Sequence, residues 1–127
     1  VYKRQGLDFT LRFDKPGGFN GREALLEQQA SGISRTLVQF RLQDPEPLLY
    51  HNEPIWRDGK LVGHVTSGAY GHTLGGCIGL GYVHLGDGEE AASVINGSYE
   101  VEVAGKRIPA DASLKPMYDP GNARIRC

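Results

Sequence analysis

The stretch 53–83 constrains the fold more than any other part of the sequence, because it consists almost entirely of strand-forming and turn-forming residues. Two runs, 54–57 and 60–66, flank the dipeptide Asp58–Gly59, which favours the positive φ angles of a tight hairpin turn. The polar and glycine-rich run 67–73 is predicted to be a loop that leads into a third strand. The stretch therefore predicts three strands that are joined by one tight turn and one longer loop.

Most of the remaining chain also has the pattern of short strands. Alternating apolar and polar residues predict strands over 7–13, 36–42 and 99–103. A turn at Ala104–Gly105 then returns the chain along 106–114, so this part forms a second hairpin.

A single short helix is predicted between the first of these strands and the next. Asn20, followed three residues later by Glu23, has the form of a capping box, and Gly32 ends the helical pattern. About six short strands with glycine-rich turns then predict a mainly β fold: a small antiparallel Greek-key-type barrel over 34–114, preceded by one strand and one helix.

Composition narrows the class of protein. The chain has 127 residues, 39% of them hydrophobic, which is enough for one core of ordinary size. A net charge of −1 indicates no nucleic acid partner, and no apolar run is long enough to cross a membrane. Cys77 lies in an apolar strand pattern and is predicted to be a buried free thiol, which favours a reducing compartment. Trp56, beside a tight turn, is predicted to be a core residue.

Several segments together resemble the glycine-cleavage T-protein (aminomethyltransferase) family. Residues 7–25 resemble the link that leaves its folate-binding domain, and Val65-Thr-Ser-Gly68 resembles its C-terminal barrel. Three further segments are similar to the branch of FAD-dependent dimethylglycine and sarcosine dehydrogenases: 44–59, 68–75 and 116–120.

The resemblance implies a domain division. Residues 1–5 are interpreted as a non-native tail, 6–33 as the end of the folate-binding domain, and 34–127 as the C-terminal barrel. The chain would then be a piece of a longer protein, with the folate-binding and FAD domains of the same polypeptide and the small-molecule folate as its partners. The implied location is the cytoplasm of a bacterium or the mitochondrial matrix of a eukaryote.

The resemblance also implies the cofactors. The parent, meaning the full-length protein, would use FAD at a site outside this chain and tetrahydrofolate at a site to which this chain contributes only a part. The catalytic aspartate of the family would lie upstream of residue 1, so we expect no catalytic residue here and no activity from the fragment alone. Two alternatives stay open: a fragment of a stand-alone aminomethyltransferase, or a non-catalytic barrel module from a folate-dependent tRNA-maintenance relative.

The predicted loop 67–73 is the strongest candidate for a cofactor-binding site, because it concentrates hydroxyl, phenol and imidazole groups beside rigid strands. Tyr70 and His72 are its principal side chains, and Ser67 is a third candidate. Tyr50 and His51 are weaker candidates for the same folate cavity. The alternative interpretation, which we weigh equally, is that 67–73 is only a structural turn.

Two other kinds of site are disfavoured by spacing. The four histidines have neither the i, i+4 helical pairing nor the neighbouring Cys-x-x-Cys that would predict a metal site: His51, His64, His72 and His84. The glycine-rich run 75–81 lacks the order G-x-G-x-x-G of a dinucleotide fingerprint. Its alternating glycines instead predict a strand against which another part of the protein packs closely.

Overall fold

A computed structural model describes residues 5–126 of the chain, apart from the side chain of Asp8. The tail predicted for residues 1–5 therefore lies outside the described residues except for Gln5, and so does Cys127. Over residues 6–126 the regular structure consists of one helix and six strands, together with two short 3-10 helices. In chain order the elements are η2 (Asp8–Thr10), α1 (Arg22–Ser31), β1 (Arg35–Leu42), β2 (Pro54–Arg57), β3 (Lys60–Gly71), β4 (Gly76–His84), η3 (Ala91–Asn96), β5 (Tyr99–Val103) and β6 (Lys106–Ser113).

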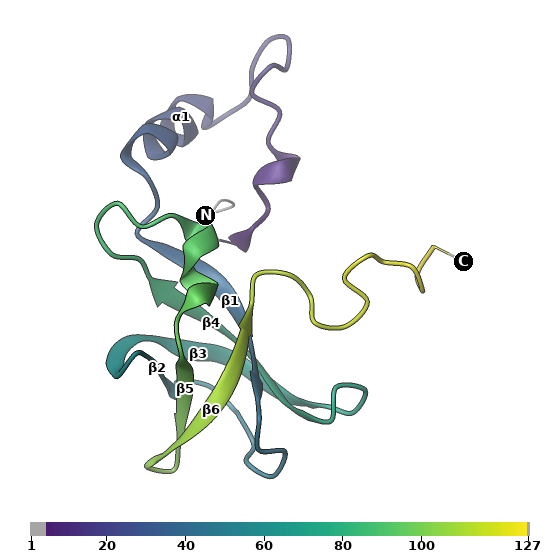
Figure 1. Ribbon diagram of the computed structural model, residues 1–127. Helices are drawn as coiled ribbons and strands as arrows, with labels where there is room; N and C mark the ends of the chain where they lie inside the picture. Colours follow the sequence, from purple (N-terminus) through teal and green to yellow (C-terminus); the bar gives the residue numbers. More distant parts are fainter. Residues whose placement is uncertain (1–4, 127) are drawn as a thin grey trace.

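The six strands form a closed antiparallel barrel in the order β1-β4-β3-β2-β5-β6 (Figure 1). Hairpins join β2, β3 and β4, and β5 returns to pair with β2 at the far side of this group. This is the Greek-key arrangement, and β1 and β6 then pair with each other to close the barrel. The predicted mainly β fold with a Greek-key barrel is confirmed.

The two tight turns form where the sequence predicts them. Asp58 and Gly59 have φ angles of 50° and 77°, and Ala104 and Gly105 have φ angles of 50° and 77° as well. Two consecutive positive φ angles match the right-handed twist of the strands that a two-residue turn connects. These turns fix the register of the β2–β3 and β5–β6 pairs.

The core lies inside the barrel and is built from alternate residues of the strands. In β1 the side chains of Val38, Phe40 and Leu42 are fully buried, whereas the intervening residues are partly exposed. The ring of Phe40 packs against that of Tyr99 in β5, with 5.2 Å between ring centroids. Period-two burial of this kind is what the alternating sequence predicts.

The prediction that residues 67–73 form a loop is wrong for most of this segment. β3 continues to Gly71, and the chain turns only at 72–75, where the N–H of Gly75 donates to the carbonyl of Gly71 over 2.8 Å. Small and glycine residues suggested a loop, but β4 lies alongside and pairs with this part of β3 as far as Gly71↔Gly76. The available partner strand outweighs the weak intrinsic preference of glycine for strands.

The strand predicted over 7–13 does not form either; the segment contains the single 3-10 turn η2. A strand needs a neighbour for its N–H and C=O groups, and the closed barrel offers no free strand edge for this segment to pair with.

The capping box predicted at the start of the helix is also wrong, because Gly21 occupies the N-cap of α1 and no side chain caps the helix there. The predicted helix end at Gly32 is confirmed.

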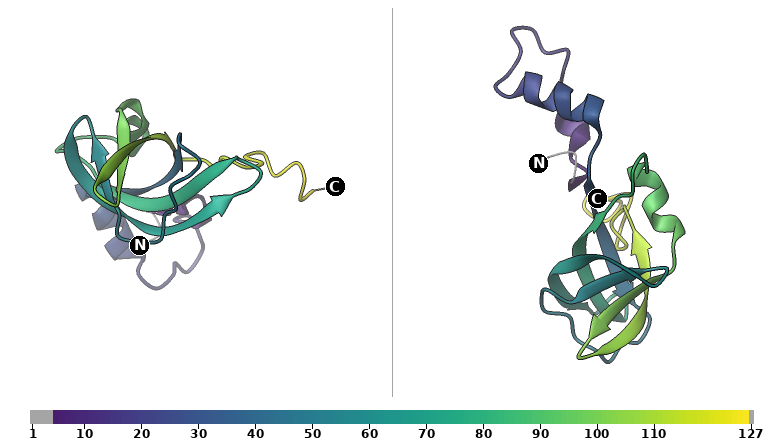
Figure 2. Two further views of the ribbon diagram at one scale, coloured as in Figure 1. Left: turned by 90° about the horizontal axis from the view of Figure 1, so that it is seen from below. Right: turned by 90° about the vertical axis from the view of Figure 1, so that its left-hand side faces the viewer.

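The segment 5–33, here called the arm, lies outside the barrel and projects from one end of it (Figure 2). Of the ten residues of α1 none is buried, and the side chain of Phe9 is 78% exposed. An isolated helix of this length is marginal in water, since packing supplies most helical stability.

We therefore expect amide hydrogens of residues 7–31 to exchange much faster than those of the barrel strands in this chain, because so little apolar surface covers the arm. Hydrogen exchange resolved by peptide mass spectrometry measures both parts in one sample. Equal protection of the arm and the barrel would show that the arm is held by contacts that its exposure does not reveal.

Candidate functional site

The candidate site lies on the β3–β4 hairpin, which extends past the point where β3 leaves β2. β2 pairs with β3 only as far as Pro54↔His64, whereas β3 and β4 stay paired to Gly71↔Gly76. Arg41 of β1 anchors the end of the hairpin, since its Nε donates to the carbonyl of Leu74 over 2.9 Å. The end of the hairpin is thus supported by β1, in a region where the sequence predicts a loop.

Tyr70 and His72 lie near each other at the end of the hairpin. Their ring centroids are 5.1 Å apart in an edge-to-face arrangement, and the side chain of Tyr70 is 39% exposed. His72 is exposed as well. The pair presents a phenol and an imidazole that remain accessible to a ligand or to another domain.

The segment 48–53 brings the other two aromatic candidates to the same hairpin. Leu49 is buried against Gly68, since a Cβ added to Gly68 would lie only 2.7 Å from the carbonyl oxygen of Leu49. The N–H of Leu49 donates to the buried Sγ of Cys77 over 3.1 Å. Because Cys77 pairs with Tyr70, the segment runs across the hairpin close to Tyr70. The predicted buried free thiol at Cys77 is confirmed.

Tyr50 and His51 follow Leu49 directly, and both are exposed. The carboxylate of Glu53 holds their loop, because its Oε1 accepts the N–H of Tyr50 over 2.9 Å. Asn52 takes a positive φ of 70° and donates its N–H to the carbonyl of Val65 in β3 over 2.7 Å. Through Asn52, these contacts hold the loop that carries Tyr50 against β3.

Ser67 lies apart from the other candidates although it is close to them in sequence. Successive residues of a strand point to opposite faces, so Ser67 and Ala69 share one face of β3 while Gly68 and Tyr70 share the other. The structure thus brings Tyr70 and His72 together, places the Tyr50–His51 loop against the same hairpin, and puts Ser67 on the opposite face of β3.

Sequence reasoning missed two residues that support the site, Arg41 and Glu53. Arg41 also forms an ion pair with Asp111 of β6, with 3.4 Å between Nη1 and Oδ2. Arg41 belongs to no local motif, because the topology of the barrel brings Leu74 and Asp111 close to it, and only the strand register could have identified it. Glu53 instead accepts from Tyr50, three residues before it in the chain, so the local spacing of these two residues was the available signal.

A second polar cluster joins β2 to the connection between β4 and β5. Nη1 of Arg57 lies 2.6 Å from Oε1 of Glu89, and the two side chains are 18% and 20% exposed. The N–H of Gly86 donates to Oε2 of Glu89 over 2.9 Å. This backbone hydrogen bond, together with the hydrogen bond from Arg57, lowers the pKa of the Glu89 carboxyl. The cluster holds the connection in place and includes none of the candidate site residues.

Three further features concern the kinds of site and segment that were considered from the sequence. Over residues 5–126 there is no group of three His, Cys, Asp or Glu side chains that could hold a metal ion. No helix in the same range has the length and apolar character needed to span a membrane. The glycine-rich run 75–81 forms the end of a turn and most of β4, and a Cβ on Gly81 would approach the carbonyl oxygen of His64 to 2.8 Å. The predicted close packing against this strand is confirmed.

Comparison with known proteins identifies the class of domain. The architecture is a closed Greek-key barrel with a projecting hairpin, and residues 35–119 match the sequence model of the glycine cleavage T-protein C-terminal barrel domain. The chain therefore belongs to the glycine cleavage T-protein C-terminal barrel family.

Individual relatives agree with this assignment. The chain is 40% identical to 4-methylaminobutanoate oxidase (formaldehyde-forming) of Paenarthrobacter nicotinovorans, in a match that covers 95% of this chain and 14% of that protein. It is 39% identical to the mitochondrial sarcosine dehydrogenase of Homo sapiens, covering 95% of this chain and 13% of the relative. The crystal structure of glycine cleavage system aminomethyltransferase T from Bartonella henselae superposes with a TM-score of 0.71 at 27% identity, over 90% of this chain and 31% of that one.

Proposed function

We propose that this chain is the C-terminal part of a folate-linked, FAD-dependent amine dehydrogenase, and that its barrel closes one side of the tetrahydrofolate cavity. One observation carries the proposal. The chain matches an amine oxidase and an amine dehydrogenase over 95% of its own length at 40% and 39% identity, but spans only 14% and 13% of theirs. Most of the parent's machinery would then lie in other domains, and the contribution of this chain would be to binding.

The exposed rings of the hairpin would suit a folate contact, and FAD would bind at a site outside this chain. FAD would supply amine oxidation and tetrahydrofolate would accept the one-carbon unit, so the cofactors would carry the difficult chemistry. Tyr70 and His72 offer exposed rings and hydrogen-bonding atoms suited to a flat pterin or its polar tail. Tyr50 and His51 would extend this contact, whereas Ser67 would face a ligand only from the opposite side of β3.

The domain division belongs to the same proposal. Residues 6–33 would be the end of the folate-binding domain, which is supported by the exposure of α1 and Phe9 in this chain. Residues 34–127 would form the C-terminal barrel domain, and its partners would be the upstream domains of the same polypeptide and the folate. The compartment would be the cytoplasm in a bacterium or the mitochondrial matrix in a eukaryote.

A stand-alone aminomethyltransferase is the second candidate, and the fold of the Bartonella henselae aminomethyltransferase supports it. The two candidates differ in the reaction that the parent carries out. An amine dehydrogenase reduces its own flavin when the methylated amine is added, whereas a stand-alone aminomethyltransferase carries no flavin to reduce.

In the parent, Tyr70→Phe and His72→Ala should each lower folate-dependent product formation while amine-dependent flavin reduction stays close to that of the wild type. Loss of one hydrogen bond or ring contact to the folate corresponds to about 1–1.5 kcal/mol, or roughly tenfold in affinity. Stopped-flow flavin absorbance measures the first step, and the yield of methylene-tetrahydrofolate at limiting folate measures the second.

His84→Ala serves as the control, because His84 is an exposed histidine at the other end of the same hairpin. It should change neither step. Unchanged folate affinity and product yield in both test variants would show that the hairpin only connects strands. A parent without bound flavin or amine-dependent reduction would instead favour the aminomethyltransferase.

A further inference from the structure

The outward side chains of β4 are apolar from Ile78 to Tyr82, before the exposed His84 that ends the strand. The inward positions of β4 are filled by glycines and by two buried side chains, Cys77 and Val83, whereas Ile78, Leu80 and Tyr82 point outward. Leu80 is 37% exposed, and the other two are partly exposed. A strand with one solvated face normally carries polar residues at such positions. Three consecutive outward apolar residues therefore need an explanation.

The neighbouring strands extend this surface at two positions and border it with polar residues at the others, where Gln39 and Ser67 flank Leu80, and Arg41 and His64 pair with Ile78 and Tyr82. Leu37 of β1 pairs with Tyr82, and Ala69 of β3 pairs with Ile78. We call these five residues, Leu37, Ala69, Ile78, Leu80 and Tyr82, the apolar outer face. A cation borders it, since the guanidinium of Arg35 lies 4.7 Å from the centre of the Tyr82 ring. An apolar centre with a polar border is the common composition of a protein interface.

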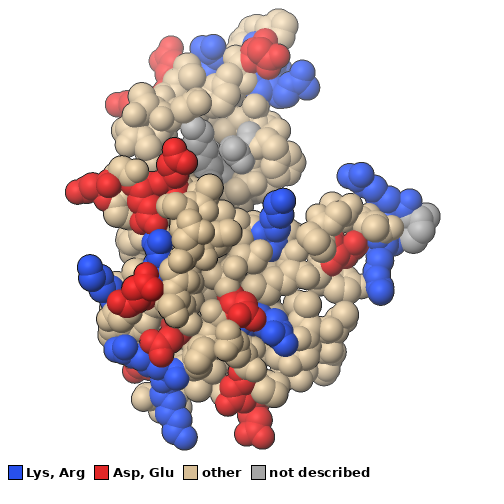
Figure 3. All heavy atoms as spheres, viewed as in Figure 1, with Lys and Arg blue, Asp and Glu red and all other residues tan. Residues whose placement is uncertain are grey.

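The opposite side of the barrel is charged. The outward residues of β5 are Glu100 and Glu102, and Arg107 of β6 pairs with Glu102, so acidic and basic side chains lie together on this side (Figure 3). Trp56 lies here instead of in the core, which corrects our prediction. The guanidinium of Arg107 covers its ring at 3.6 Å, and its Nε1 donates to Glu102 over 3.0 Å. The apolar outer face is therefore a local feature of one side.

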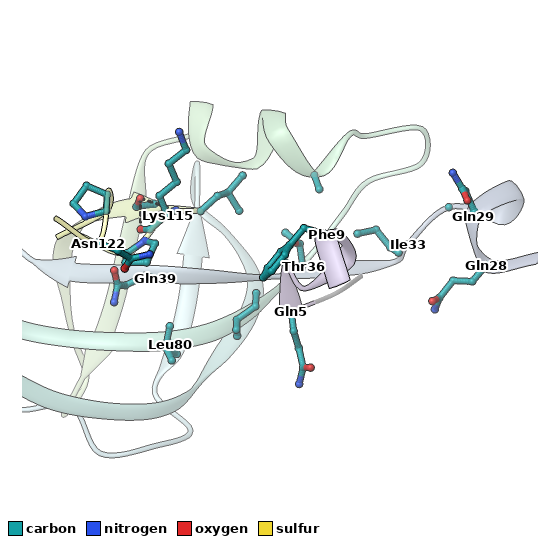
Figure 4. Close-up of a pocket in the computed structure, with 18 residues that line it drawn as sticks. Gln5, Phe9, Gln28, Gln29, Ile33, Thr36, Gln39, Leu80, Lys115 and Asn122 are labelled. Atoms are coloured by element: carbon teal, nitrogen blue, oxygen red, sulfur yellow. Dashed lines mark hydrogen bonds between the residues drawn. The ribbon is translucent and has the colours of Figure 1, made fainter. Parts of the chain in front are cut away.

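A cavity of about 860 Å³ lies between the apolar outer face, the arm and the C-terminal segment. Phe9 of the arm, Leu37 and Leu80 of the barrel, and Leu114 after β6 all line it; Figure 4 shows Phe9, Leu80 and the polar Gln39 around it. Phe9 is 78% exposed and Leu114 is 40% exposed, so the chain does not seal the cavity by itself. Exposed apolar patches of this kind mark interaction sites.

We propose that the apolar outer face is the surface on which the upstream domain of the same polypeptide docks, with Leu80 at its centre. The inference rests on the proposed function only in so far as a longer parent exists. The arm, which the proposed division assigns to that domain, runs directly into β1 at Arg35, so the domain is tethered beside Leu37. The matched relatives extend far beyond this chain, which spans only 14% and 13% of their lengths.

The test measures the accessibility of position 80 in the full-length parent. Leu80→Cys should react with a maleimide at least about tenfold more slowly than Leu61→Cys, because a docked domain excludes the reagent. Leu61, on β3 beside the Asp58–Gly59 turn, is a matched control, since it is 51% exposed and outside the apolar outer face. Peptide mass spectrometry separates these sites from the native cysteines. Ala69→Cys provides a second reporter on the same face if Leu80→Cys lowers stability.

A photo-crosslinking residue introduced at position 80 then identifies what covers it. We expect crosslinks to peptides upstream of residue 6 in the same polypeptide, at a yield that does not change on dilution. Labelling of positions 80 and 69 as fast as position 61 would overturn the proposal. So would crosslinks between two copies, or shielding that disappears on dilution, because both indicate self-association. Since the readout requires neither flavin nor folate, it can succeed or fail independently of the proposed function.

Discussion

Gly63→Ala should destabilise the barrel by about 3 kcal/mol or more. A Cβ at this position would fall on the carbonyl oxygen of Tyr82, which belongs to the backbone of β4 and cannot rotate away as a side chain can. Overpacking costs roughly 1–3 kcal/mol, and disturbing the buried ladder hydrogen bonds beside it adds about 1–3 kcal/mol. The lower unfolded-state entropy of alanine offsets only about 0.4–1 kcal/mol.

Chemical denaturation monitored through the single tryptophan measures this loss, because Trp56 reports on the β2–β5–β6 side of the sheet. Gly121→Ala is the control: a Cβ there would have no heavy atom within 4 Å, so its effect should be within about 0.5 kcal/mol. A Gly63→Ala variant as stable as the wild type would mean that β3 and β4 are further apart than the structure shows.

The example of Gly63 shows which parts of the fold can be predicted from sequence. The tight turns at Asp58–Gly59 and Ala104–Gly105 depend on backbone angles that few residues adopt, so local sequence specifies them. The requirement for glycine at position 63 depends instead on the distance to the carbonyl of Tyr82 in β4, nineteen residues further along the chain. The residues next to Gly63 in the sequence do not indicate that distance.

The candidate site shows the same division between local and long-range information. Proximity of Tyr70 and His72 follows from their spacing, and the structure places their rings 5.1 Å apart. The extension of β3 through the predicted loop follows from pairing with β4, which outweighs the composition of the segment. Part of the apolar outer face is visible in the sequence, because Gly79 and Gly81 alternate with the apolar residues Ile78, Leu80 and Tyr82. Which side of β4 points into the core follows only from the closure of the barrel, which the sequence of β4 alone does not specify.

Glu89→Gln should lower the free energy of unfolding by about 2 kcal/mol at neutral pH, and the loss should disappear in acid. The substitution removes the negative charge that pairs with the mostly buried guanidinium of Arg57 across 2.6 Å. Hydrogen bonds to charged groups contribute roughly 1.5–3 kcal/mol. The pKa of Glu89 is lowered in the folded state by the N–H of Gly86 and then by Arg57, so the carboxylate stabilises the fold above its ordinary pKa of about 4.3. This contribution is lost as the pH falls through the lowered pKa.

Urea denaturation of the wild type and the variant from pH 7 down to pH 3 therefore tests the sign as well as the size of the effect. The two stability curves should approach each other as the pH falls below about 4.3 and through the lowered pKa of Glu89, since protonation gives the wild type a neutral group at the same position. Glu90→Gln, in the same connection but exposed, should follow the wild type throughout. A difference between Glu89→Gln and the wild type that stays constant over the whole pH range would mean that the Glu89 side chain contributes through packing or neutral hydrogen bonds, with no net contribution from its charge.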